Sequence, residues 1–210
     1  MPAANLTIVD HPLVAARLGI MRAKQTPPDI FRRCLQEISM VLFVEASRGW
    51  STNSSDIETP LAKSAAKVLS HAIVLAPILR AGLGMCDGIL RVVPEAAVAH
   101  LGLYRDPKTL RPVTYYSRMP GNLADARVML LDPMLATGYS ACGAVSILKK
   151  SGGTMIQFLC VLSCEAGIQQ LQREHPDVTI MTAAVDPELN SAGYIVPGLG
   201  DAGDRYFATE

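Results

Sequence analysis

The chain has 210 residues, and its 19 Lys and Arg residues balance 19 Asp and Glu residues, so the formal net charge is zero. That balance argues against a protein that coats nucleic acid or an anionic membrane surface, since either function needs a basic excess. Half of the residues are apolar and 18% are charged, so the chain can fill a sizeable core and is not disordered. We expect a single domain over residues 1–210.

The cysteines predict reduced, buried thiols. They form no C-x-x-C pair, have no zinc-like spacing to the histidines and lie in apolar surroundings; they are Cys34, Cys86, Cys142, Cys160 and Cys164. Asp10 comes too early for a signal peptide, and no apolar run reaches the roughly 18 residues of a membrane span. We therefore expect a cytoplasmic protein with no resident metal and no membrane partner.

A first clear helix is predicted to begin within residues 26–29. Thr26 is expected to cap it, Pro27 suits the first helical position, and Asp29 completes a capping-box spacing. Apolar residues then recur with helical spacing at Phe31, Cys34, Leu35, Ile38, Val41 and Leu42. Residues 49–60 are polar and rich in turn formers, which predicts a loop.

From residue 72 onward, short apolar runs alternate with helix-like stretches. The runs span residues 72–79, 96–104, 127–132, 155–163 and 179–185. Such near-continuous apolar strands, alternating with helices, indicate an α/β fold with a parallel sheet covered on both faces. Residues 104–120 look like a two-stranded hairpin, and residues 186–210 are rich in Gly and Pro with little periodicity.

Ligands of open α/β sheets bind at the carboxyl ends of the strands. In this chain that rule selects four places, which are Arg80, Tyr104–Arg105, residues 132–140 and the segment after Val185.

Residues 128–141 carry the strongest local signal. An apolar strand ends at Asp132, and Thr137-Gly138-Tyr139-Ser140 opens a helix that ends near Lys150. A helix N-terminus suits a phosphate, Gly138 lets the backbone approach closely, and an acidic residue can accept hydrogen bonds from ribose hydroxyls. The alternative is an ordinary strand–turn–helix with a Thr or Ser cap, and the pattern alone does not separate the two.

The glycine-rich segment 193–205 contains a G-x-G-x-x-G string at residues 198–203. The string lies seven residues from the end of the chain, so we expect no helix, strand or ribose-binding acid to follow it, and a dinucleotide site is disfavoured. We instead predict a loop whose main-chain groups touch a flat ligand, with Asp201 and Asp204 nearby. The alternative is a surface turn in which glycines supply positive φ.

Five motifs in this order resemble the uracil phosphoribosyltransferases, a group within the type I phosphoribosyltransferases. The motifs are PILRAGLGM at 77–85, GLYRD at 102–106, PVTYYSRMP at 112–120, DPMLATG at 132–138 and GYIVPGLGDAGDR at 193–205. The resemblance runs from about Glu58 to the end of the chain, and more faintly includes HPLV at 11–14 and EASR at 45–48.

The resemblance implies a type I phosphoribosyltransferase fold, with a parallel sheet flanked by helices, a β-hairpin and a C-terminal hood loop. It implies that uracil and 5-phospho-α-D-ribose 1-diphosphate (PRPP) are converted to UMP and diphosphate in pyrimidine salvage, with Mg²⁺ carried by PRPP. It also implies a homo-dimer or higher homo-oligomer and GTP as an allosteric activator.

The resemblance assigns site residues one by one. Arg80 and Arg105 would hold the pyrophosphate of PRPP, and with Asp201 they would carry catalysis. The phosphate and ribose would be cradled by Asp132, Pro133, Met134, Leu135, Ala136, Thr137, Gly138, Tyr139 and Ser140. Uracil would be read by main-chain groups of Ile195, Gly200, Asp201 and Ala202, with Asp201 also facing PRPP.

The chain departs from the family pattern at two places. Tyr139 stands where the family usually has a second glycine, and residues 44–49 read VEASRG rather than YEATRD. The first alternative function is a catalytically weak, nucleotide-binding regulator on the same fold. A transferase for another base is disfavoured by the complete 193–205 loop.

Overall fold

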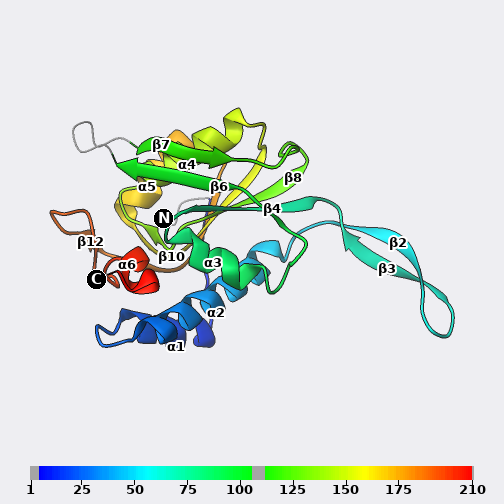
Figure 1. The fold of residues 1–210 in the computed structure, drawn as a ribbon, viewed down its shortest axis with the longest axis horizontal. Helices are drawn as coiled ribbons and strands as arrows, with labels where there is room; N and C mark the ends of the chain where they lie inside the picture. Colours follow the sequence, from blue (N-terminus) through cyan, green and yellow to red (C-terminus); the bar gives the residue numbers. More distant parts are fainter. Residues whose placement is uncertain (1–4, 106–111, 210) are drawn as a thin grey trace.

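The computed structural model describes residues 5–105 and 112–209, which build one nine-stranded sheet with two small two-stranded sheets (Figure 1). Along the main path the strands are β1 (Leu6–Ile8), β11 (Thr179–Asp186), β10 (Met155–Cys164), β8 (Ala126–Leu131), β4 (Ala72–Leu79), β6 (His100–Arg105) and β7 (Pro112–Arg118). The short strands β5 (Ala97–Val98) and β9 (Met134–Leu135) pair with β4 and β10. Every pair in this sheet is parallel except β6–β7.

The predicted α/β architecture is confirmed, because the central strands are buried on both faces. Residues 73–78 of β4 and most of β10 are buried. Each face of such a strand packs against an apolar layer, so a polar side chain at every second position would be buried without a partner. The sequences of these strands are therefore continuous apolar runs.

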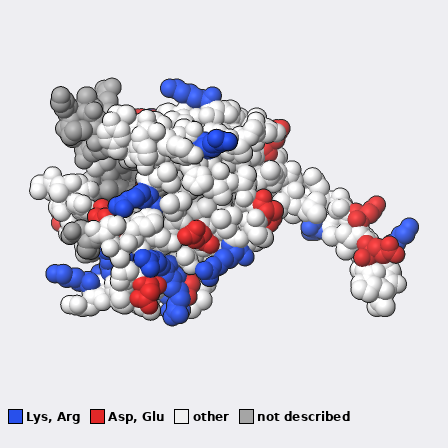
Figure 2. All heavy atoms as spheres, viewed as in Figure 1, with Lys and Arg blue, Asp and Glu red and all other residues white. Residues whose placement is uncertain are grey.

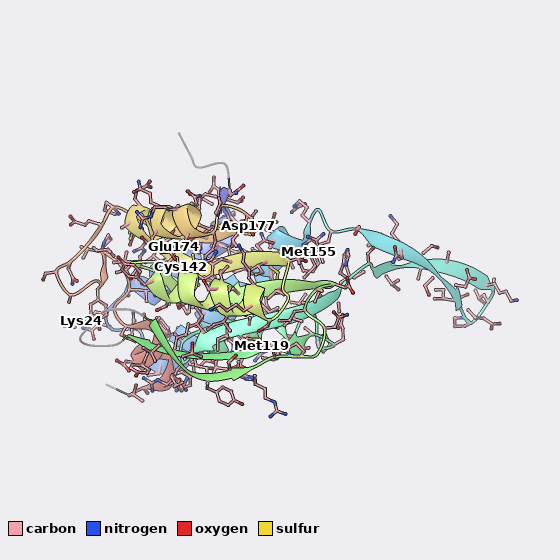
Figure 3. The ribbon with its side chains drawn as sticks, turned by 90° about the horizontal axis from the view of Figure 1, so that it is seen from above. Lys24, Met119, Cys142, Met155, Glu174 and Asp177 are labelled. Atoms are coloured by element: carbon pink, nitrogen blue, oxygen red, sulfur yellow. The ribbon has the colours of Figure 1, made fainter. Side chains whose placement is uncertain are left out.

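Two layers of helices cover the sheet (Figures 1 and 3). One core cluster unites a sheet face with α1 (Pro12–Arg22), α2 (Pro28–Ser47), α3 (Gly82–Ile89) and α6 (Ala202–Phe207). The other cluster unites the opposite face with α4 (Tyr139–Lys150) and α5 (Glu165–Glu174). Figure 3 shows α4 and α5 side by side, with Cys142 and Glu174 at their contact.

The loop predicted for residues 49–60 is wrong. Strand β2 (Thr52–Glu58) pairs antiparallel with β3 (Lys63–Leu69), and this hairpin projects from the body as an arm (Figure 1). Nearly all of its residues are exposed, with none fully buried. Because neither face of the arm is covered, its strands lack the apolar alternation on which a strand prediction rests.

The start of the long helix also differs from the prediction. Pro27, rather than Thr26, is the residue that precedes the first helical turn, and the Thr26 hydroxyl donates to the Ile20 carbonyl at 2.5 Å. Thr26 instead provides a hydrogen-bond donor to a carbonyl in the last turn of α1, an earlier helix that was not predicted from the sequence. His11 caps that helix by accepting the Leu13 N–H at 3.2 Å.

Two further boundaries need correction. The hairpin predicted within 104–120 is formed by β6 and β7, so the predicted strand 96–104 already contains most of its first strand. A short helix, α6, begins within the G-x-G-x-x-G string at Ala202 and continues past it to Phe207, so the expectation of no helix there is wrong; Asp201 caps its first turn. The remaining C-terminal segment forms the small pair β12 (Glu188–Leu189) and β13 (Ile195–Val196).

Candidate active site

The carboxyl ends of the parallel strands bring distant segments to one edge of the sheet, on the side opposite the arm (Figure 1). Arg80 follows β4, Asp132 follows β8, and Asp186 ends β11. Neighbouring strands in this region are parallel, so the segments that follow them emerge on the same side. This edge is where a ligand site is expected.

Residues 132–140 form a loop whose backbone is held from several directions. Within it, β9 pairs with β10, and the Pro133 carbonyl accepts the N–H groups of Val161 at 3.0 Å and Leu162 at 2.9 Å. The Cys164 thiol donates to the Ala136 carbonyl at 3.0 Å. The sheet itself therefore fixes the shape of this loop.

Gly138 joins the loop to α4 in the left-handed region, with φ of +82°. A Cβ at this position would lie 2.8 Å from the Gly167 carbonyl oxygen and 2.9 Å from Gln170 Cβ. A Cβ at Gly167 would in turn lie 2.5 Å from the Ala136 carbonyl oxygen. Helix α5 thus packs directly on the loop, and both contact points have room only for glycine.

A small cavity of about 80 Å³ lies against this loop and the first turn of α4. Its lining residues are Asp132, Met134, Leu135, Ala136, Thr137, Gly138, Ser140 and Ala141. No side chain among the described residues caps the start of α4, so its first N–H groups are available to an anion. Backbone N–H groups and hydroxyl groups, such as those of Thr137 and Ser140 here, are typical donors to a phosphate.

A second cavity of about 220 Å³ adjoins the first and shares Asp132, Met134 and Ala136 with it. Its other lining residues are Ala81, Gly193, Tyr194, Ile195, Gly200, Asp201, Ala202 and Gly203. The glycine-rich loop contributes little side-chain bulk, so its main-chain groups border the space. Two compartments that share an acidic wall can hold the two halves of one nucleotide.

Asp132 and Asp201 both line this second cavity. The pKa of Asp132 is raised to about 7, mainly by burial; the hydrogen bond from the Met134 N–H opposes this rise, and the nearby charge of Asp201 adds to it. An ionised carboxylate accepts hydrogen bonds from hydroxyl groups more strongly than a protonated one. Because the pKa of Asp132 lies near neutrality, a bound ligand that donates from hydroxyl groups would favour the ionised form.

Arg80 lies at the rim of the site rather than in either cavity. Its guanidinium donates to Asp204 Oδ1 at 3.1 Å and lies 5.4 Å from the centre of the Phe207 ring, and its side chain is about half exposed. Arg105 ends β6 at the same edge, and its side chain lies outside the described residues.

Most of the residues that the sequence selected for the site meet here. The two cavities are lined by Asp132, Met134, Leu135, Ala136, Thr137, Gly138, Ser140, Ile195, Gly200, Asp201 and Ala202. Pro133 and Tyr139 line neither cavity. Tyr139 begins α4 and is exposed, and the positive φ falls on Gly138 before it, as expected from an ordinary helical backbone at 139.

Four residues of the larger cavity were missed by the sequence interpretation, namely Ala81, Gly193, Tyr194 and Gly203. Each is adjacent to a residue that was selected or belongs to the same motif. The motifs therefore indicated the right segments, but only the fold shows which residues of those segments line the cavity.

Among residues 5–105 and 112–209, no helix combines the length and apolar character needed to cross a bilayer. The same residues contain no group of three or more His, Cys, Asp or Glu side chains arranged to hold a metal ion.

Comparison with known proteins gives consistent matches over the whole chain. The family model described as uracil phosphoribosyltransferase matches residues 8–209. A curated uracil phosphoribosyltransferase from Myxococcus xanthus is 52% identical over 211 residues and covers 100% of both chains.

Solved structures match the fold as well. The AQ2163 protein from Aquifex aeolicus has a TM-score of 0.92 at 33% identity, covering 98% of this chain and 99% of that one. An adenine phosphoribosyltransferase from Trypanosoma brucei has a TM-score of 0.57 at 13% identity, covering 86% and 84%, and so supports the fold alone. With a family match over residues 8–209 and a relative that is 52% identical over its whole length, this chain belongs to the uracil phosphoribosyltransferase family.

Proposed function

We propose that this chain catalyses the reaction of uracil with PRPP to give UMP and diphosphate. The observation that carries the proposal is the pair of adjoining cavities, one beside the start of α4 and the other bordered by the glycine-rich loop, with Asp132 in both. The names of relatives at about half identity support uracil as the base. The resemblance supports a single transferase domain spanning residues 1–210.

The phosphate and ribose of PRPP are assigned to the 132–140 loop. The 5′-phosphate would accept hydrogen bonds from the backbone at the start of α4 and from the hydroxyls of Thr137 and Ser140. Asp132 would accept hydrogen bonds from the ribose hydroxyls, since it borders both cavities. This placement directs the anomeric carbon toward the larger cavity.

Uracil is assigned to the larger cavity. One edge of the base presents an acceptor, a donor and an acceptor, which main-chain groups of Ile195 and residues 200–202 can match. Cytosine would leave buried polar groups unpaired, at about 1–3 kcal/mol each. The loop therefore supplies specificity through its backbone.

Catalysis would come from orientation and from stabilising the leaving group. The bond from the anomeric carbon to the pyrophosphate oxygen breaks, the bond to uracil N1 forms, and the N1 proton passes to solvent. Arg80 and Arg105 would bind the departing diphosphate through charge-assisted hydrogen bonds. Asp204 already pairs with Arg80, which keeps that guanidinium at the rim of the site.

A magnesium ion carried by PRPP fits these residues. Asp132 and Asp201 border one cavity, and Mg²⁺ prefers a few carboxylate oxygens together with substrate phosphates. The ion would neutralise the charge of the pyrophosphate, and Asp201 would supply a carboxylate oxygen to hold it.

A diphosphate-release assay with several bases tests the proposed specificity. We expect release with uracil and PRPP, and a rate with cytosine lower by at least about tenfold, since cytosine mismatches two groups of the base edge and each unpaired group costs about 1–3 kcal/mol. Equal rates with both bases would contradict the assignment of the 200–202 backbone. Tight PRPP binding without release would favour the regulator as the alternative function.

Tyr139→Gly tests whether the loop binds phosphate through its backbone. The Tyr139 side chain is exposed and lines neither cavity, so the variant should bind PRPP with unchanged affinity and turn over as fast or faster. Calorimetric titration with Mg²⁺ and PRPP measures the affinity. A clear loss of PRPP binding would show that the tyrosine ring itself contacts the ligand.

We also propose a cytoplasmic homo-oligomer that is activated by GTP, in line with the family resemblance. The five buried, unpaired cysteines are compatible with a reducing compartment. For the oligomer, the β2–β3 arm supports a second copy as the partner. It exposes apolar side chains, with Leu61 96% accessible, and bears both acidic and basic residues toward its far end (Figure 2).

Charged substitutions on the arm test this partner. Ile57→Glu combined with Leu61→Glu is expected to convert the oligomer to a monomer in sedimentation velocity, because two charges would be buried at the interface. A control is Leu13→Glu, which changes an exposed apolar residue on α1, 62% accessible, away from the arm. An arm variant that sediments like the parent would contradict the arm as the contact.

A further inference from the structure

Two arginines connect helix α1 to the glycine-rich loop, although α1 lines neither cavity of the candidate site. Arg22, the last residue of α1, forms a two-pronged ion pair with Asp186 at the end of β11, with N–O distances of 2.6 and 2.7 Å. Asp186 is 5% exposed, and the Arg22 side chain is about one-quarter exposed. This is the most buried ion pair among the described residues.

The backbone of Gly198 forms a hydrogen bond with each member of this ion pair. Its carbonyl accepts from Arg22 at 2.9 Å, and its N–H donates to Asp186 Oδ2 at 2.9 Å. Gly198 has φ of +60°, and a Cβ there would collide with the Ile195 carbonyl. The pair thus holds both polar groups of a residue that must take a tight, left-handed turn.

Arg205 adds a second connection from α6. Its guanidinium donates to the Leu199 carbonyl at 2.8 Å, to the Ala23 carbonyl at 2.7 Å and to the Met21 carbonyl. Its charge lies 4.6 Å from the centre of the Phe31 ring. The end of α1 and residues 198–199 are therefore fixed to each other by the charged side chains of Arg22 and Arg205.

The charge of Asp186 persists in this arrangement. Burial raises the pKa of its carboxyl, but the hydrogen bonds from Arg22 and the Gly198 N–H, with the Arg22 charge, outweigh burial and hold the pKa below its ordinary value. The ion pair is therefore complete at neutral pH, and it shapes the segment that leads directly into Gly200, Asp201 and Ala202.

We infer that Arg22 and Asp186 are positioning residues for the base, which set the affinity for uracil by fixing Gly198 and so the backbone of residues 200–202. The inference rests on the proposed function. Neither residue lines the cavities, so the effect is transmitted through the loop rather than through contact with the substrate.

Arg22→Lys is the test variant, because lysine keeps the charge but cannot bridge both carboxylate oxygens and the Gly198 carbonyl with a rigid planar fork. We expect KM for uracil to rise by about tenfold, while kcat and KM for PRPP change by less than about twofold. The matched control is Arg17→Lys on the same helix. Arg17 pairs with Glu37 away from the loop, and its replacement should leave all three constants unchanged.

The outcomes separate this inference from the proposed function. If the parent forms no UMP, the proposed function fails. If the parent is active and folded Arg22→Lys keeps its KM for uracil, or raises both KM values equally, the positioning inference is overturned.

Asp186→Asn provides a second variant, judged by the same constants, since asparagine keeps the shape and one acceptor. If both variants fail to fold by circular dichroism, the pair is a stability element only and the inference is also overturned.

Discussion

Gly138→Ala is expected to weaken PRPP binding by more than about tenfold while leaving the sheet intact. The positive φ alone costs a residue with a side chain about 1–2 kcal/mol. The added Cβ would also lie 2.8 Å from the Gly167 carbonyl oxygen, and backbone there cannot move without displacing α5. The loop would have to change shape at the point where the phosphate is proposed to bind.

Two further glycine variants separate conformational strain from steric conflict. Gly152→Ala has the same strain, with φ of +95°, but open space around the new Cβ, so it should lower stability without changing the Kd for PRPP. Gly167→Ala has no positive φ, but its Cβ would lie 2.5 Å from the Ala136 carbonyl oxygen, so it should weaken PRPP binding. Calorimetric Kd values within twofold of the parent for folded Gly138→Ala would contradict this account of the loop.

Asp132→Asn is expected to weaken PRPP binding and to remove most of its pH dependence. Burial raises the pKa of Asp132 to about 7, with the charge of Asp201 as a further cause, so the carboxyl is largely protonated in mildly acidic solution. Ribose hydroxyls donate to the ionised form. The affinity of the parent for PRPP should therefore rise as the pH increases through about 7, then level off.

The same pKa shift predicts an effect on stability with a definite sign. The folded protein retains this proton between the ordinary pKa of 3.8 and about 7, so the contribution of Asp132 to stability is most favourable below 3.8 and declines as the pH rises through 7. Asp132→Asn should therefore raise the melting temperature at about pH 8.5 more than at about pH 5.5.

Calorimetric titrations with PRPP and thermal unfolding curves, each at about pH 5.5 and pH 8.5 for the parent and the variant, check the predictions for affinity and for stability. Any pH dependence that remains in Asp132→Asn belongs to the phosphates of PRPP. Equal pH dependence in the two proteins, or a lower melting temperature of the variant at high pH, would contradict the assigned pKa.

Burial explains which parts of the fold were predictable. Strand β4 has the predicted limits, Ala72–Leu79, because a strand covered on both faces needs a continuous apolar run. Neither face of the β2–β3 arm is covered, so its sequence has no such apolar run and predicted a loop. The local pattern of apolar residues therefore predicts strands that are buried, and it does not predict a strand whose two faces are both exposed.

The candidate site shows the same division. The 132–140 loop and the 200–202 segment were each recognisable as motifs, and the structure adds that they border one cavity through Asp132 and Asp201. The Arg22–Asp186 pair joins residues 164 positions apart, and nothing near either residue marks it. Contacts between distant segments depend on the packing of α1 against β11, which no local pattern encodes.

The measurement that tests the central claim most directly is the conversion of labelled uracil to UMP by the full chain with PRPP and Mg²⁺, followed by chromatography. The account predicts one UMP and one diphosphate for each uracil consumed, no product without PRPP, and sharply reduced product with Gly138→Ala but not with Gly152→Ala. Absence of UMP from folded protein that binds PRPP, or full activity in Gly138→Ala, would contradict it.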